Sequence, residues 1–176
     1  MHTITTEAEE KRYAELQVMA LDFARRGETE SLIAMIDHGL PVNLSDHKGH
    51  TLLMLASYNG RVETTCALLE RGADVDRRNL RGQTPLGGAA FKGYEEIASL
   101  LLAHGADIDA DNGGGMTPVM FAAMFGRIKV VEQLKEHGAS LNRRNRLGIS
   151  ARSLMRLTRP INLIFGRKAI QRTSAE

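Results

Sequence analysis

Glycine, threonine and alanine recur along this chain at a fixed interval of 33 residues. The recurring positions are Gly49, Gly82, Gly115 and Gly148, then Thr51, Thr84 and Thr117, then Ala56, Ala89 and Ala122, then Gly60, Gly93 and Gly126, and then Gly72, Gly105 and Gly138. A period of this length is typical of proteins that stack one small supersecondary unit many times. The sequence therefore predicts a solenoid, in which each unit contacts only its neighbours.

Each repeat unit has the sequence signals of two short helices. Thr51, Thr84 and Thr117 stand where a side-chain oxygen can accept from the free backbone amides of a helix start. Pro85 and Pro118 follow at the first helical position, where a missing N–H group costs nothing. A glycine then permits the left-handed turn that ends the helix, and a second amphipathic helix leads to another glycine. Helices this short are marginal alone, so adjacent units are expected to bury each other's apolar faces.

The central unit carries a long and specific motif. Its segments are Gly82-Gln83-Thr84-Pro85-Leu86, Ala89-Ala90, Gly93 and Leu101-Leu102-Ala103-His104-Gly105-Ala106-Asp107-Ile108. In these segments the unit resembles an ankyrin repeat, and residues 49–75 and 115–141 resemble two further copies. The resemblance covers about residues 13–158 and implies an all-α ankyrin-repeat solenoid of stacked helix-turn-helix units with hairpin loops. Residues 51–58 and 88–93 are similar to small bacterial ankyrin-repeat proteins.

The chain departs from this family at the position that follows Thr-Pro-Leu. The family has histidine there, whereas this chain has Met54, Gly87 or Met120, so the usual hydrogen bonds of that histidine are absent. Gly87 and Gly88 also weaken the predicted first helix of their unit by about 1 kcal/mol each, relative to alanine.

The period divides the chain into successive units. These are an N-terminal extension (1–12), an N-terminal capping repeat (13–45), full repeats (46–78, 79–111 and 112–144), a degenerate C-terminal capping repeat (145–166) and a basic tail (167–176). Both capping repeats lack the Thr-Pro start, and a polar outer face on a terminal repeat keeps such an array soluble. Pro160 stands where the second helix of the last unit would begin, and Gly166 interrupts that helix. Fraying is expected beyond Gly166.

Composition excludes several classes of protein. The single cysteine, Cys66, cannot form an intramolecular disulfide, so a disulfide-stapled secreted scaffold is excluded. Residues 1–12 have no apolar stretch like that of a signal peptide, and no apolar run is long enough to cross a membrane. The sequence therefore predicts a cytoplasmic protein without a membrane span.

The two parts of the chain differ in charge. Residues 1–142 hold 14 Lys and Arg against 20 Asp and Glu, whereas residues 143–176 hold 9 Lys and Arg against one Glu. This basic end can solubilise the last repeat, contact an acidic protein or membrane surface, or bind nucleic acid. Solubilisation is the favoured interpretation, and nucleic acid is the least favoured because Phe165 is the only aromatic residue in this segment.

Residues that could carry chemistry are explained by the repeat itself. His38, His104 and His137 share one repeat position, too far apart for one metal ion, and histidine is favourable in the last turn of a helix. His47 and His50 are expected in an exposed turn, and residues 113–115 form a glycine turn rather than a phosphate loop. Paired aspartates, which are Asp74, Asp76, Asp107 and Asp109, recur as turn residues. Cys66 is expected in the core as an inert thiol. We therefore expect no catalytic residue, no cofactor and no metal, and no enzymatic activity.

The resemblance implies a partner-binding surface on the hairpin tips and the exposed side of the first helices. Carried over by position, the candidate partner-binding residues are Tyr58, Asn59, Phe91, Lys92, Met124, Phe125, Arg81, Gln83, His47, Lys48, His50 and Met116. Tyr58, Phe91 and Met124 form one column of residue types common in binding hot spots, unless they only fill gaps between helices.

The expected function is non-catalytic protein–protein interaction through the concave face, by a monomer, with one or more partner proteins. Two alternatives remain open from the sequence. The chain could be a dedicated inhibitor, immunity protein or stress-associated accessory protein for one enzyme, or it could bind nucleic acid through its basic C-terminal tail.

Overall fold

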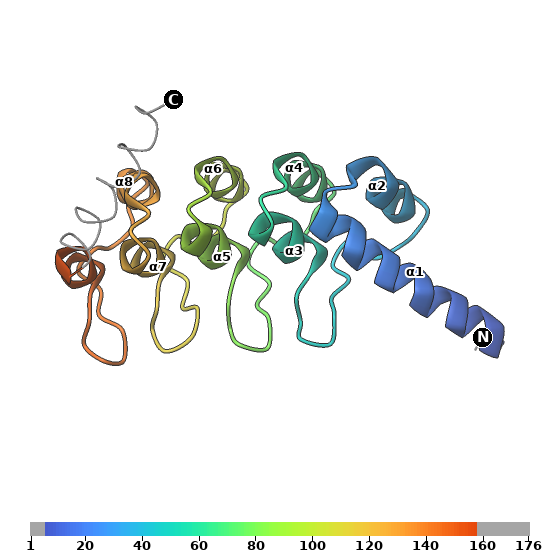
Figure 1. Cartoon of the computed structure of the whole chain (residues 1–176), viewed down its shortest axis with the longest axis horizontal. Helices are drawn as coiled ribbons and strands as arrows, with labels where there is room; N and C mark the ends of the chain where they lie inside the picture. The colour runs from blue at the N-terminus through green and yellow to red at the C-terminus, as the bar shows by residue number, and fades with distance from the viewer. Residues whose placement is uncertain (1–5, 158–176) are drawn as a thin grey trace, which may run out of the picture.

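A computed structural model describes residues 6–157, and its helices stack in pairs along one axis (Figure 1). The named helices are α1 (Glu7–Arg26), α2 (Thr29–Asp37), α3 (Leu52–Tyr58), α4 (Val62–Glu70), α5 (Pro85–Lys92), α6 (Glu95–Ala103), α7 (Pro118–Met124) and α8 (Ile128–Glu136). Residues 151–157, at the end of the described part, are also helical. Within residues 6–157 the only β-type pairings are two isolated bridges, Ser45–Thr51 and Arg144–Ser150. The expected all-α repeat architecture is confirmed.

The helices form two layers. One layer contains α1, α3, α5 and α7 in sequence, and the other contains α2, α4, α6 and α8 (Figure 1). Each first-layer helix also packs against the second helix of its own unit. Hairpin loops before α3, α5 and α7 extend beyond the first layer (Figure 1). The first helices and the hairpins therefore border one continuous side of the stack.

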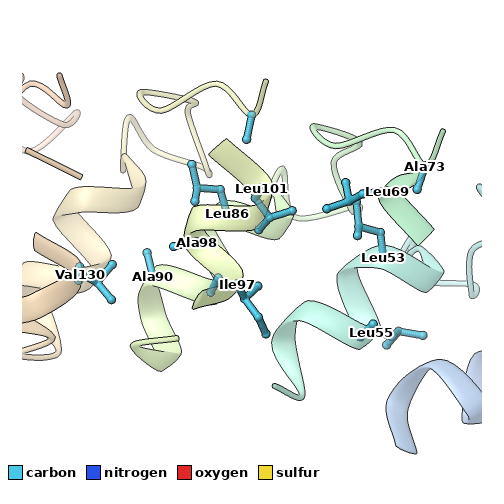
Figure 2. Packing of buried hydrophobic residues seen from close by; sticks show 14 of the residues in the cluster. Leu53, Leu55, Leu69, Ala73, Leu86, Ala90, Ile97, Ala98, Leu101 and Val130 are labelled. Carbon is cyan, nitrogen blue, oxygen red and sulfur yellow. The ribbon is translucent and has the colours of Figure 1, made fainter. Parts of the chain in front are cut away.

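Small side chains let the first helices approach one another closely. Ala56, Ala89 and Ala122 occupy equivalent positions in α3, α5 and α7, and all three are fully buried. Larger side chains fill the space between the layers, as Leu86 of α5 and Leu101 of α6 do in the central unit (Figure 2). One cluster of buried apolar residues runs through all the units, which is how helices of seven to nine residues become stable.

Two of the three expected threonine caps form, and one does not. Thr51 Oγ1 accepts from the Met54 amide at 3.1 Å, and Thr84 Oγ1 accepts from the Gly87 amide at 3.2 Å. The expected cap by Thr117 is wrong, because its buried hydroxyl has no partner among the described residues. The amide that it would bind, that of Met120, instead donates to the Thr117 carbonyl at 3.0 Å.

The first helix begins earlier than the repeat pattern indicated. Thr6 Oγ1 accepts from the Glu9 amide and the Glu9 carboxylate accepts from the Thr6 amide, so the two residues form a capping box. Helix α1 therefore begins at Glu7 and has 20 residues. The boundary expected after residue 12 falls within this helix.

Cys66 does not lie in the core, and that expectation is wrong. The buried stripe of α4 consists of Thr64, Thr65, Leu68 and Leu69, so position 66 falls on its margin, partly exposed. The Cys66 Sγ lies 3.5 Å from Glu70 Oε1. Partial burial and this neighbouring carboxylate raise the pKa of the thiol, which disfavours the reactive thiolate.

The structure describes only part of the C-terminal end of the chain, up to residue 157. Three basic residues of the basic end (143–176) bind within the chain, since Arg143 donates to Asp109 O, Arg144 to Gly148 O and Arg152 to Asn142 Oδ1. Pro160, Gly166 and the basic tail at 167–176 lie outside the described residues. No helix in residues 6–157 combines the length and the apolar character needed to cross a membrane.

Candidate partner-binding groove

A hollow of about 590 Å³ lies between the first-layer helices and the hairpins that precede α3 and α5. Its floor comes from apolar side chains of three successive first helices, together with Gly87 and Gly88 of α5. The floor side chains are Met54, Leu55 and Tyr58 of α3, Phe91 of α5 and Phe121 of α7. Its polar wall comes from the last turn of α1 and from the hairpins around residues 46–50 and 79–83. We call this hollow the groove.

The two glycines of α5 have different surroundings. A Cβ at Gly87 would lie 2.0 Å from Asn112 Oδ1, so the space beside this residue is already filled. A Cβ at Gly88 would have one neighbour within 4 Å, the Tyr58 Cδ2 atom at 3.4 Å, which is an ordinary contact. The groove is therefore open at Gly88, where almost any other residue would project a side chain into it.

Asn112 occupies the space that Gly87 leaves. It is buried, its Oδ1 accepts from the Thr84 amide at 2.7 Å and the Thr84 hydroxyl at 3.0 Å, and its Nδ2 donates to the Ala110 carbonyl at 3.0 Å. This side chain thus ties the hairpin of one repeat to the helix start of the preceding repeat. Any side chain at position 87 would displace it.

A shift of one residue in its hairpin turns Asn112 inward. In the other hairpins Asp46, Asn79 and Asn145 accept from the backbone amides two and four residues later. Asn112 stands at the equivalent repeat position, but Asp111 accepts these bonds instead, from Gly113 and Gly115, both at 2.8 Å. The three glycines at 113–115 all have positive φ and accommodate this shifted turn.

Aromatic rings form a row along the first-layer helices. The Tyr58 and Phe91 rings stack with centroids 6.2 Å apart, and the Phe91 and Phe125 rings meet edge to face at 4.4 Å. The Lys92 ammonium lies over the Tyr58 ring, 5.1 Å from its centroid. Phe91 therefore packs between two rings, while Tyr58 remains 43% exposed. Because of this packing, Tyr58 is a cleaner probe of the groove surface than Phe91.

The polar wall is mainly cationic. Arg25, Lys48 and Arg81 line it together with the imidazoles of His47 and His50. Asp46 is the only carboxylate among the lining residues.

The charge of Asp46 is already compensated. Arg25 lies 3.6 Å from its carboxylate, and the His50 ring lies 3.0 Å away. Burial raises the pKa of Asp46, but hydrogen bonds from the His50 side chain and from the His50 and Lys48 amides outweigh it and bring the pKa to about 2. Asp46 therefore adds no free negative charge to the groove.

The structure brings most of the candidate partner-binding residues to the groove. Those that line it are Tyr58, Asn59, Phe91, Arg81, Gln83, His47, Lys48 and His50. Lys92, Met124 and Phe125 lie outside the groove lining, although Lys92 and Phe125 contact its aromatic residues. Met116 is not a free tip residue, because it packs partly buried against the core and its sulfur accepts from Asn145 Nδ2 at 3.2 Å.

Sequence reasoning did not place several lining residues in the groove. These are Asp46, Met54, Leu55, Asn79, Thr84, Gly87, Gly88, Asn112 and Phe121. The signal for the opening was present, since two adjacent glycines inside a predicted helix need a packing or functional reason. The inward turn of Asn112 had no comparable signal, because the 33-residue register placed it at the tip.

The side chains of the recurring histidines and aspartates form hydrogen bonds with backbone groups, in agreement with the structural roles that the repeat pattern predicted. His38, His104 and His137 each donate from Nδ1 to the carbonyl one turn earlier, at 2.7, 2.9 and 2.8 Å. Asp76 accepts from the Asp107 amide and Asp109 from the Ser140 amide, which links successive repeats. Residues 6–157 contain no group of three or more His, Cys, Asp or Glu arranged to hold a metal ion.

Comparisons with known proteins agree with this architecture. A family model described as ankyrin repeats (3 copies) matches residues 17–79 and 76–145, which is well over half of the chain. A Pseudomonas aeruginosa protein whose name assigns it to the ankyrin repeat proteins is 54% identical over 39 residues. That match covers 22% of this chain and 23% of the other, so the chain spans about a quarter of this curated relative. The stacked helix pairs, the hairpins and the family model together show that the chain belongs to the ankyrin repeat family.

Proposed function

We propose that this chain is a non-catalytic binding protein that holds a partner protein in the groove. Ankyrin repeats in general mediate protein–protein interactions. The observation that carries the proposal is the groove itself, a hollow of about 590 Å³ with an apolar floor and a polar wall. That combination is the usual composition of a binding interface, in which a buried apolar centre is surrounded by a polar rim.

The exposed part of the aromatic row supports the same proposal. Tyr58 presents a large, half-exposed ring at the edge of the floor, held by Phe91 on one side and by the Lys92 ammonium. A ring that is already ordered loses little conformational freedom on binding, which is why such residues contribute much of the binding energy in interfaces.

Site-specific photo-crosslinking in cells tests this proposal and captures the partner in the same experiment. A benzophenone amino acid is placed at Tyr58 and, as a matched control, at Ile128 in the second layer. These residues are 43% and 45% exposed, so the two probes meet solvent to the same extent. We expect a discrete protein adduct from position 58 and none from position 128.

The adduct must then be reproduced with purified components. The captured protein should bind the wild-type chain in calorimetry, and Tyr58→Ala should weaken that binding at least tenfold while the circular dichroism spectrum is unchanged. Equal adducts from both positions, or equal affinities of the wild type and Tyr58→Ala, would show that the groove is not the binding surface.

A further inference from the structure

The sign of charge in the groove is opposite to that of the repeats that build it. Residues 1–142 carry six more acidic than basic residues, yet the groove wall presents Arg25, Lys48, Arg81 and two imidazoles. Within the described part of the chain, neither Lys48 nor Arg81 forms a side-chain ion pair. Lys48 and Arg81 are therefore available to a ligand, and they favour one that carries carboxylates.

The floor favours an apolar side chain. Met54, Leu55, Phe91 and Phe121 line the same hollow as Gly88, where a Cβ would meet one ring atom of Tyr58 and nothing else within 4 Å. Gly88 is a residue of α5, in which alanine would be more stable by about 0.5–1 kcal/mol. The fold thus carries a less stable residue at the one floor position where a side chain would fill the groove.

We propose that the groove binds an acidic segment of the partner protein, with one bulky apolar side chain of that segment packed against Gly88. This inference rests on the proposed function, that the groove holds a partner protein. Carboxylates beside that side chain lie against Arg81 and Lys48 on the hairpin wall. Burial of the apolar side chain away from water provides most of the affinity. The charges fix the orientation of the bound segment and increase its association rate.

The ring geometry favours a peptide over a single-stranded nucleic acid, the other ligand that cations and aromatic rings can bind. Bases need free ring faces for stacking. Tyr58 and Phe91 stack on each other, Lys92 lies over the Tyr58 ring, and the Phe125 ring meets Phe91. These contacts within the protein therefore leave little free ring face on which a base could stack.

The test is selection from a random-sequence peptide display library against the purified full-length chain. We expect enriched peptides in which Leu, Ile, Met or Phe has Asp or Glu within two positions. An enriched peptide is then synthesised, and its affinity is measured by fluorescence anisotropy for the wild type and for matched variants, each checked for folding by circular dichroism.

Two pairs of variants separate the apolar pocket from the charged wall. Gly88→Leu fills the pocket and should weaken binding at least tenfold, whereas Ala103→Leu, which adds the same side chain to exposed α6 surface, should change it less than twofold. Arg81→Glu should weaken binding at least fivefold and reduce its salt dependence, whereas Lys135→Glu makes the same charge change on α8 and should have little effect. If Gly88→Leu does not fold, Gly88→Ala replaces it and should weaken binding at least threefold.

Several outcomes would overturn the proposal. These are no enrichment at all, enrichment without acidic residues, equal binding by the wild type and the Gly88 variants, and displacement of the peptide by a mixed-sequence single-stranded oligonucleotide. If an adduct still forms at Tyr58 while the Gly88 variants bind normally, the groove holds a protein but the apolar pocket does not contribute. The proposed function would then stand and this inference would fail.

Discussion

At the scale of single residues, the shape of the groove depends on two adjacent glycines of α5, which have no side chain. Gly87 makes room for Asn112, which satisfies the Thr84 amide and hydroxyl, whereas Gly88 leaves space that no side chain fills. The same residue type therefore has a structural role at one position and opens the groove at the next. This distinction depends on the Asn112 side chain, 25 positions after Gly87, so the local sequence around α5 does not contain it.

Alanine substitution at the two glycines should have opposite effects on stability. Gly88→Ala should stabilise the fold by about 0.5–1 kcal/mol, because alanine loses less backbone entropy in a helix and its methyl group makes an ordinary contact. Gly87→Ala should destabilise it by about 1–3 kcal/mol, because Asn112 must move and leave buried polar groups unpaired. Urea unfolding monitored by circular dichroism measures both changes.

A double variant checks the cause. If Gly87→Ala acts through Asn112, combining it with Asn112→Ala should cost less than the sum of the two single changes. Strict additivity, or a stabilising effect of Gly87→Ala alone, would contradict the arrangement of these two residues.

Asp46 should make stability depend on pH in the acid range. Hydrogen bonds from His50 and from two backbone amides outweigh burial and lower its pKa from 3.8 to about 2. A lowered carboxyl pKa stabilises the fold above the unfolded pKa, and this contribution is lost as pH falls from about 4 through about 2.

The matched variant for this prediction is Asp46→Asn. Asparagine accepts the same amide bonds at the equivalent positions Asn79 and Asn145, so the hairpin should persist. The free energy of unfolding of the wild type minus that of the variant should decrease by about 2 kcal/mol between pH 6 and pH 2. A difference that is flat with pH would show that Asp46 is not held as the structure places it.

At the scale of elements, the equivalent threonines do not all cap the first helices that they precede. Thr51 and Thr84 cap α3 and α5 through their hydroxyls, whereas the buried Thr117 hydroxyl at the start of α7 has no partner in the described part of the chain. The sequence predicted all three caps because all three threonines share one repeat position. It did not predict the difference, which depends on backbone geometry in a hairpin with one shifted residue.

Replacing each threonine with valine tests this difference. Thr51→Val and Thr84→Val remove a hydroxyl that accepts from the helix, so each should cost about 0.5–2 kcal/mol of stability. Thr117→Val removes a buried hydroxyl without a partner and should be neutral or stabilising. Thermal unfolding of the three variants gives the comparison, and a loss at position 117 as large as that at 84 would refute it.

At the scale of the whole molecule, the 33-residue period was sufficient to predict the fold. It predicted two short helices in each full unit, and the structure has them as α3 and α4, α5 and α6, and α7 and α8. Periodicity succeeds here because each unit packs only against its neighbours, so a local pattern specifies nearly every contact.

Features that break the period were harder to predict. Thr6 and Glu9 begin α1 before the first repeat, and Asp111 takes over a turn one residue early. Cys66 lies on the margin of a stripe in which two threonines are buried instead. The 33-residue repeat predicted that the hairpin residues and the exposed rings belong to the groove. The open floor at Gly88 was not predicted, because it depends on which side chains lie near Gly88 in space.

Whether the groove is the binding surface is tested by amide chemical-shift mapping of the labelled chain during titration with the partner captured through position 58. We expect the shifts to concentrate in residues 46–50 and 79–84 and in α3 and α5, with Gly88 among the largest, while α4, α6 and α8 stay nearly unchanged. Shifts centred on α4, α6 and α8, or on residues 7–20 of α1, would contradict this expectation.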